Sequence, residues 1–222
     1  MQKQESKKQT NTVIKWILAT VILVTLIIGG AFISGTFYPN VWTVEKIEAE
    51  VHKKELNQVK LLGLREPEFE YTDKTSFLLA TSKCVEYLNY TTDRLSRVPT
   101  SIIIAMAGVE SGWGTSRFAN EGNALFGVRT WDLKNVAHMK AKGNPDASWG
   151  VKKYKTKCQS VHDMIKILNR HPAYKEFRVE REQQLDDGKW NYRKLMVLMN
   201  AWSTNPDYHE IILQAIVDNK LP

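Results

Sequence analysis

The sequence predicts a mainly α-helical domain with a small irregular or β lobe, preceded by an N-terminal transmembrane helix. Three observations predict this class. Residues 16–44 carry no charged side chain. Beyond Asp73, hydrophobic residues mostly recur with helical spacing. Between Phe126 and Tyr154 that spacing is lost, and Gly, Pro and Trp residues interrupt the chain. A chain of 222 residues that is 43% hydrophobic can bury one ordinary core.

The uncharged segment near the N-terminus predicts a membrane anchor. It contains the apolar stretch WILATVILVTLIIGGAFISG, and about 20 apolar residues are needed to cross a bilayer core. Four lysines and one glutamate precede it. Because cytoplasmic flanks are rich in Lys and Arg, we expect residues 1–15 to form a basic cytoplasmic tail. Residues 16–38 are then a single-pass signal anchor in the cytoplasmic (inner) membrane, with the rest of the chain outside.

A cleaved signal peptide is the alternative to an anchor. Its apolar region is shorter and ends at a small-residue A-x-A-like site, which GGAFISGTFYP does not resemble. The polar residues 39–72 are predicted to form a stalk, with a short helix around Val44–Leu62. The main domain is expected to occupy residues 73–222.

Helical periodicity in the main domain predicts five helices, over residues 73–95, 99–113, 160–174, 189–202 and 205–219. Pro99 and Gly112 bracket the second of these, which is the usual asymmetry of helix ends. Ser160, followed by Asp163, predicts the N-terminal cap of the third. Asp186-Asp187-Gly188 is predicted to be a turn. Within the lobe, SWGVKKY is the best candidate for a strand.

Composition narrows the range of ligands. The formal net charge of +7 is dispersed along the chain without a zinc-finger or RNA-binding signature, so we expect no nucleic-acid partner. Attraction to an anionic surface, such as a membrane or cell wall, explains the charge better. The five histidines lack ligand spacing, so we predict no metal and no cofactor. Cys84 and Cys158 are compatible with either a disulfide or two buried thiols.

One carboxylate stands out at the end of the most apolar helix. Residues 99–109 carry no charge, and Glu110 follows them directly, before Ser-Gly-Trp-Gly. Burial and the negative end of the helix dipole both disfavour an ionised carboxyl, so the pKa of Glu110 should lie above its reference value of about 4.3. A carboxyl that keeps its proton near neutrality suits a general acid that protonates a glycosidic oxygen. Trp113 beside it offers an aromatic face for a sugar ring.

A purely structural role is the alternative for both residues. Glu110 would then pair with Arg117 or Arg129 at the helix end, and Trp113 would be an ordinary core side chain.

The motifs around Glu110 resemble those of a known family. VESGWGTSRFANEGNALFGV resembles the ESGWG…S…A…NLFGI signature of the bacterial glucosaminidases, glycoside hydrolase family 73. VKKYKTKCQSVHDMIKILNRHPAYKEFR is similar to its FRxYxSxxxSxxxxxxxLxxxPxY segment, and AWSTNPDYHEIILQAI to its YATDPxYxxKLxxII ending. GTSRFAxEGNxLFG and HPAYxxxR place the chain nearest the Bax-like branch. The resemblance covers about 150 residues.

This resemblance implies a lysozyme-like fold and cleavage of the β-1,4 bond after N-acetylglucosamine in peptidoglycan. Glu110 is then the proton donor, and peptidoglycan glycan strands are the partner, beside the membrane bound by the N-terminal helix. Trp113 and Tyr208 become groove residues. Asn123 and Phe126, in the matched turn, become further substrate-binding candidates, although Phe126 also fits a packing role. Protein partners are not indicated.

The sequence departs from the family in two places. Ala124 stands where Asn usually precedes Leu-Phe-Gly, and Gly150 stands where Bax-like sequences often carry a second acid. The acids left nearby are Glu121, Asp132 and Asp146, of which Asp146 is nearest to the expected place and becomes the candidate second catalytic acid. Without one, the substrate's acetamido group could act as nucleophile. The alternative functions are those of a lytic transglycosylase and of a catalytically inactive wall-binding or scaffold module.

Overall fold

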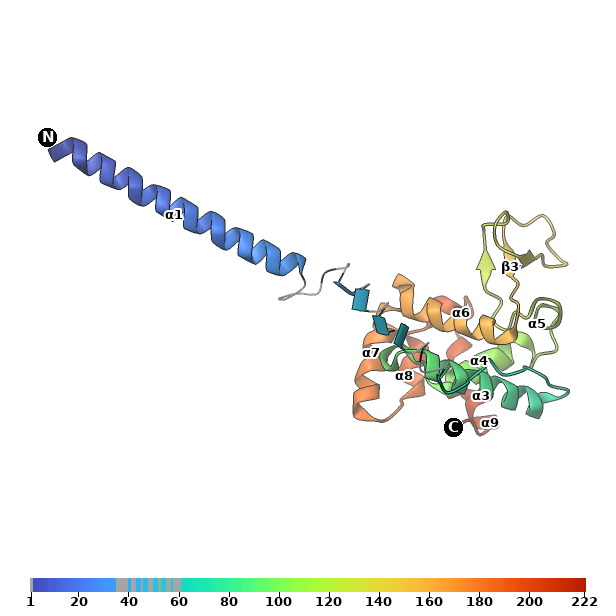
Figure 1. Cartoon of the computed structure of the whole chain (residues 1–222). Coiled ribbons are helices and arrows are strands. Elements are labelled where there is room, and N and C mark those ends of the chain that lie inside the picture. Colours follow the sequence, from blue (N-terminus) through green and yellow to red (C-terminus); the bar gives the residue numbers. More distant parts are fainter. Residues whose placement is uncertain are drawn as a thin grey trace. The chain divides into compact units, whose positions relative to one another are not determined.

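The computed structural model describes residues 2–34 and 61–222, together with residues 40, 43–44, 46–47, 50–51, 53–54 and 57. The chain divides into two compact units, Met1–Lys54 and Glu55–Pro222, which are described separately. Figure 1 shows the long N-terminal helix of the first unit and the helical domain of the second.

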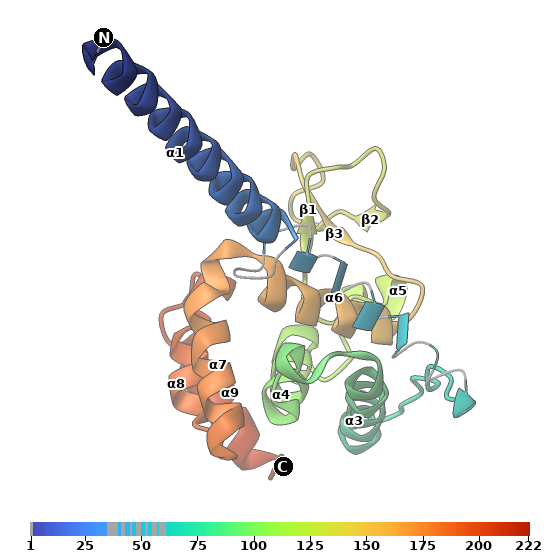
Figure 2. The ribbon, with the colours of Figure 1, turned by 60° about the vertical axis from the view of Figure 1, so that its left-hand side comes forward.

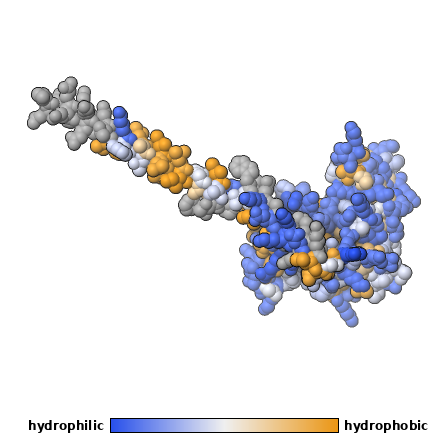
Figure 3. All heavy atoms as spheres, in the orientation of Figure 1, coloured by the Kyte–Doolittle hydropathy of each residue, from blue (hydrophilic) through white to orange (hydrophobic). Residues whose placement is uncertain are grey.

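The first unit is dominated by helix α1, Gln2–Ile33. Its segment Val13–Ile33 has a mean hydropathy of 2.5, and none of it is buried within the protein. Its 21 residues span about 31 Å as a helix, which matches the hydrocarbon thickness of a bilayer. The hydroxyls of Thr20 and Thr25 donate to carbonyls one turn back, so neither is left without a partner. Figure 3 shows the hydrophobic residues gathered along this helix.

Parts of the sequence prediction for this unit lie outside the described residues. The predicted tail and the start of the predicted anchor form one continuous helix, α1. Residues 35–39, where the anchor was expected to end, are outside the described part of the chain, as is much of the predicted stalk helix.

Helix α4, Thr100–Ser111, is the centre of the second unit, with every residue from Ser101 to Gly108 buried. It packs between α3 (Lys74–Thr91) and α9 (Tyr208–Asp218), as Figure 2 shows. A helix covered all round in this way needs no polar face, which explains its uninterrupted apolar sequence. The other helices are α5 (Arg117–Gly122), α6 (Lys157–Arg170), α7 (Lys175–Asp187), α8 (Tyr192–Val197) and the 3-10 turns Arg94–Ser96, Pro172–Tyr174 and Asn200–Trp202.

The observed helix ends agree in part with those predicted from the sequence. Gly112 ends α4 with a φ of 59°, in the left-handed region expected of a C-terminal glycine. The predicted cap at Ser160 is wrong. Helix α6 begins earlier, and the Thr156 hydroxyl accepts from the backbone N–H of Gln159. Ser160 is instead buried, where its hydroxyl accepts from the backbone N–H of Leu125.

Helix α7 is absent from the sequence prediction, although its C-terminal turn at Asp186-Asp187-Gly188 was expected. Three of its four buried residues are polar or charged, namely Glu180, Arg181 and Gln184. They are stabilised by polar contacts: Arg181 donates to Asn169, and Glu180 pairs with Lys194 of α8. Because its buried face is not apolar, the helix leaves no hydrophobic stripe in the sequence.

The small lobe holds a three-stranded antiparallel sheet in the order β1-β3-β2. Its strands are β1 (Arg129–Thr130), β2 (His138–Met139) and β3 (Gly150–Lys152). The central strand β3 lies in the segment predicted to be extended. Figure 1 shows the lobe standing beside α5 and α6. The predicted fold class, a mainly α domain with a small β lobe after the helix that carries Glu110, is confirmed.

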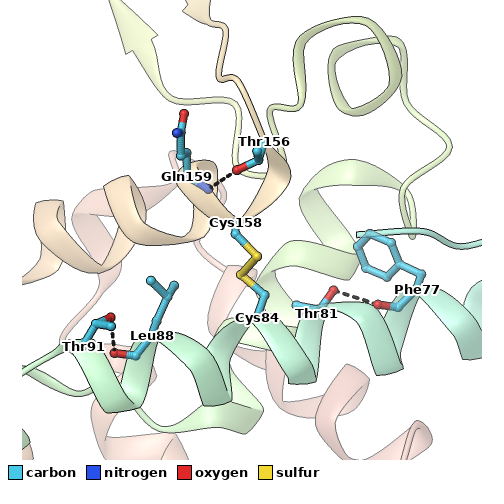
Figure 4. The surroundings of a disulfide bond; sticks show 8 residues. All are labelled: Phe77, Thr81, Cys84, Leu88, Thr91, Thr156, Cys158 and Gln159. Atoms are coloured by element: carbon cyan, nitrogen blue, oxygen red, sulfur yellow. Dashed lines mark hydrogen bonds between the residues drawn. A yellow bond between two sulfur atoms is a disulfide. The ribbon is translucent and has the colours of Figure 1, made fainter. Parts of the chain in front are cut away.

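A disulfide joins α3 to α6, which answers the question left open for the cysteines. Cys84 and Cys158 are both buried, with Cα atoms 5.6 Å apart, a usual spacing for a disulfide. Figure 4 shows the bond crossing from one helix to the other. It closes a loop over a sequence separation of 74, which includes α4, α5 and the whole lobe.

We expect a variant with Cys84→Ala and Cys158→Ala to lose about 2–4 kcal/mol of unfolding free energy, because the unfolded chain gains freedom when so long a loop is opened. Urea unfolding of the full chain measures the loss. Reductant should destabilise the unaltered protein and leave the double variant unchanged. Equal sensitivity of both proteins to reductant would contradict the disulfide.

Candidate active site

The turn after α4 fixes the position of the helix end that carries Glu110. The Ser111 hydroxyl donates back to the Ala107 carbonyl and accepts from the backbone N–H of Gly114. Tyr71, in the segment before α3, donates its hydroxyl to the Gly114 carbonyl at 2.7 Å. A Cβ on Gly114 would lie 2.5 Å from the Tyr71 ring, so only glycine fits there. The segment entering the domain therefore holds the turn in place.

Glu110 emerges from this helix end among aromatic side chains. The indole N–H of Trp202 donates to its carboxylate oxygen Oε1 at 3.2 Å. The Trp202 ring is held in turn by Phe126 and Tyr174, with ring centroids 6.4 and 6.5 Å away. Tyr208 lies on the same side, at the first residue of α9. Residues from α4, from the 3-10 turns at Tyr174 and Trp202, and from α9 thus meet around one acid.

The Tyr208 hydroxyl is buried and makes no hydrogen bond of normal geometry within the described part of the chain. It is nevertheless close enough to Glu110 for each group to shift the pKa of the other. This is an electrostatic contact, because the two groups do not reach the geometry of a hydrogen bond. A buried hydroxyl without a partner is unusual. It is available to donate to whatever accepts beside Glu110.

Burial raises the pKa of Glu110 above its usual value, and the nearby Tyr208 hydroxyl and the Trp202 indole N–H lower it by less. The residue as a whole is exposed, yet enough protein surrounds the carboxyl for burial to be the largest effect on its pKa. A carboxyl that is open on one side and enclosed on the others keeps its proton to higher pH, while a ligand can still reach it.

No cation neutralises Glu110 among the described residues. Arg117 pairs with Glu121 at 3.3 Å and donates to the Lys140 carbonyl. Arg129 lies 4.1 Å from the centre of the Trp149 ring. Both arginines that could have made Glu110 a structural ion pair are therefore engaged elsewhere, which removes the main alternative for this residue.

Asn123 and Phe126 lie where they organise the domain. Asn123 ends α5 in the left-handed region, with a φ of 52°. Its amide nitrogen donates to the carbonyls of Tyr154 and Lys155, and its oxygen accepts from Lys157. The Asn123 side chain thus ties α5 to the chain leaving the lobe. Phe126 is buried behind Trp202, on which it packs edge to face.

The structure brings none of the candidate second acids into a described contact with Glu110. Asp146 lies exposed on a turn of the lobe. Asp132 accepts from the backbone N–H and the amide of Asn135, and Glu121 pairs with Arg117. At Gly150, a Cβ would lie 2.6 Å from the His138 ring, so the position cannot hold an acidic side chain while His138 keeps its place.

Trp113 lies in a separate groove of about 570 Å³, which neither Glu110 nor its aromatic neighbours line. A smaller pocket of about 200 Å³ is lined by Tyr208, the residue whose hydroxyl lies near the acid. Hydroxyl and amide side chains from the loop between α8 and α9 line it, including Asn200, Ser203 and Asn205. The smaller pocket is the better candidate for the reaction, because it touches a residue in contact with the acid.

Sequence reasoning named Glu110, Phe126 and Tyr208, which lie together, but missed Trp202 and Tyr174. Trp202 is 92 residues from Glu110 in the sequence, so no local spacing could connect them. The family motif could have identified Trp202, because this residue occupies the first aromatic position of YATDPxY.

These features define a class. An acid with a raised pKa at the end of a buried helix, among aromatic side chains, is typical of enzymes that cleave glycosidic bonds. The sequence pattern of one such family, described as mannosyl-glycoprotein endo-beta-N-acetylglucosaminidase, matches residues 90–221, and the chain belongs to this glucosaminidase family.

The chain is also similar to a relative from the Bax-like branch of the family. The chain is 37% identical to Protein bax of Escherichia coli strain K12 over 93 residues, which are 41% of this chain and 31% of that protein. The match thus spans about a third of the relative's length. Among solved structures, the catalytic domain of the autolysin Auto from Listeria monocytogenes aligns with a TM-score of 0.48 and 19% identity, covering 75% of this chain and 94% of that one.

The raised pKa of Glu110 predicts a pH-dependent effect on stability. Above that pKa the folded protein holds an enclosed charge, so Glu110→Gln should raise the melting temperature. Below the ordinary carboxyl pKa of 4.5 both side chains are neutral, so the gain should vanish. Thermal unfolding of the full chain from acid to neutral pH measures this. A stability difference that does not change with pH would argue against an enclosed carboxyl.

Proposed function

We propose that the protein is a membrane-anchored peptidoglycan hydrolase that cleaves the β-1,4 bond after N-acetylglucosamine, with Glu110 as general acid. One observation carries the proposal: Glu110 has no cation partner in the described part of the chain, and its pKa is raised. Such a carboxyl is protonated more often near neutrality than a free one. Membership of the glucosaminidase family supplies the class of substrate.

The proton transfer follows from the contacts of Glu110. Its carboxyl gives a proton to the glycosidic oxygen as the bond from that oxygen to the sugar C1 breaks. The side chain is then a carboxylate, which needs donors. Trp202 already donates to Oε1, and the unpartnered hydroxyl of Tyr208 can turn toward the new charge. Two donors placed before the charge develops favour the transition state.

The nucleophile is proposed to come from the substrate. Since no second carboxylate contacts Glu110 in the described part of the chain, the acetamido oxygen of N-acetylglucosamine attacks C1 and forms a cyclic oxazolinium as the leaving sugar departs. Water then adds to C1 and reopens the ring, giving its proton to the Glu110 carboxylate. The acid is thereby restored, and the product keeps the configuration of the substrate. Asp146 stays the candidate if a protein carboxylate takes part.

The anchor sets where this chemistry takes place. We propose that Val13–Ile33 spans the cytoplasmic membrane with the lysine-rich N-terminus inside, because the flank before it carries the positive charge. The domain that holds Glu110 then lies on the outer side, with the cell wall. A buried disulfide agrees with this side, because disulfides persist in oxidising compartments.

The first test is product analysis with the full chain and purified peptidoglycan. We expect new reducing N-acetylglucosamine ends by mass spectrometry, and Glu110→Gln should lower the rate by about 10²–10⁴-fold. Anhydromuramic ends would indicate a lytic transglycosylase instead. Undiminished release by the Glu110→Gln variant would refute the assigned acid, and no release by either protein would favour a wall-binding module.

The matched control is Asp146→Asn, which removes the candidate second acid by the same change of carboxyl to amide. Substrate assistance predicts that this variant retains most of the activity. A loss comparable to that of Glu110→Gln would assign the second role to Asp146 and reject the acetamido nucleophile.

A second test uses the pH profile. The Tyr208 hydroxyl lowers the pKa of Glu110, so Tyr208→Phe should raise that pKa and move the alkaline limb of activity to higher pH. Tyr192→Phe is the control, because the Tyr192 hydroxyl bonds Ser101 and the Pro222 carbonyl, away from the acid. An alkaline limb that stays in place in Tyr208→Phe, or moves equally in both variants, would separate Tyr208 from the titration of Glu110.

A further inference from the structure

The groove of about 570 Å³ lies on a different face of α4 from the acid. Val109 and Trp113 line it from the end of α4, Lys74 from the start of α3, and Ile211, Gln214 and Asp218 from the outer side of α9. Glu110 is absent from its lining, since successive residues of a helix point about 100° apart. The groove therefore needs an explanation of its own.

Trp113 is held at this groove by an unusual backbone. Its φ is 55°, in the left-handed region, where a bulky residue other than glycine is an outlier. The indole lies against Gly108 of α4, where a Cβ would come within 2.2 Å of the ring. A glycine inside a helix is itself unfavourable. Two locally unfavourable choices thus combine to place one indole at the groove, and strained backbone of this kind clusters at functional sites.

A solvated cation also contacts the indole. The Lys74 ammonium lies 4.0 Å from the ring centre, and within the described part of the chain it has no carboxylate within ion-pair distance. Lys74 is exposed, and a cation–π contact at an exposed site is weak. A ligand ring can displace the ammonium and still use it as a donor at the edge of the groove.

The rest of the lining suits a neutral ligand rich in hydroxyl groups. Val109 and Ile211 give an apolar floor beside the indole. The Gln214 amide donates to the Asp218 carboxylate at 2.6 Å, so amide and carboxylate stand as a paired donor and acceptor at the rim. The carboxylates of Asp218 and Glu210 outnumber the one lysine of the lining, Lys74, which disfavours a polyanion such as nucleic acid or a phosphate polymer. An aromatic face flanked by amide and carboxylate groups suits a binding site for a pyranose ring.

From this geometry we infer that the Trp113 groove is a second glycan-binding site, which holds an N-acetylated sugar strand outside the active site. The identity of the ligand rests on the proposed function, whereas the existence of the site rests on the groove. A second contact raises the effective concentration of the strand at the domain. It would keep a strand bound after one cut.

The test counts glycan sites on the full chain carrying Glu110→Gln, in lipid nanodiscs without any sugar-based detergent. The probe is a soluble oligosaccharide of β-1,4-linked N-acetylglucosamine, titrated by calorimetry. We expect two sites. Gln214→Ala combined with Asp218→Ala should weaken one of them by about tenfold or more, and the sugar should protect backbone amides of α9 from hydrogen exchange only where that rim is intact.

Val217→Ala is the matched control, because this exposed residue is on the same helix but does not line the groove. It should retain both sites, and thermal unfolding should show that all variants fold. A single site, two sites that survive the double change, or no bound sugar at all would overturn the inference. So would a groove occupied by a second copy of the chain, seen as a dimer that the double change abolishes. Failure of the proposed function would look different, because the unaltered protein would bind sugar yet release no product from peptidoglycan.

Discussion

The chemistry proposed for this protein depends on the enclosure of one carboxyl group. Helix α4 is buried on every side until its last turn, where Glu110 leaves the core among aromatic rings. Burial raises the pKa of this acid more than its two donors lower it. The same arrangement costs stability when the acid ionises, so the fold must be held firmly by other contacts.

Those contacts hold α4, α5 and the lobe in place. The disulfide between α3 and α6 closes the loop that contains α4 and the lobe. Tyr71 bonds the Gly114 carbonyl just after α4, and Asn123 ties α5 to the chain returning from the lobe. Asp163 adds a further tie, since Lys152 and Tyr154 both donate to it at 2.8 Å. Each contact joins residues at least nine positions apart, so the site is assembled by tertiary structure rather than by one local motif.

The sequence predicted those features that depend on interactions between residues close together in the chain. The uncharged residues 99–109, with Pro99 at their start and Gly112 just beyond their end, predicted α4. The lone acid that follows them predicted Glu110 as the focus of the site. The sequence could not predict α7, because its buried face is polar. Nor could it predict the cap at Thr156, because Ser160 is an equally plausible cap residue. Trp202 and the isolation of Trp113 from Glu110 depend on how distant helices pack. The disulfide was one of two open choices, because spacing alone does not bring α3 beside α6.

The close approach of His138 to Gly150 constrains how this lobe can evolve. A side chain at position 150 would meet Cβ, Cγ and Cδ2 of the histidine within 3.0 Å, so the imidazole cannot simply swing aside. Any substitution at position 150 therefore needs a second change, either a smaller residue at position 138 or a different placement of β2 against β3.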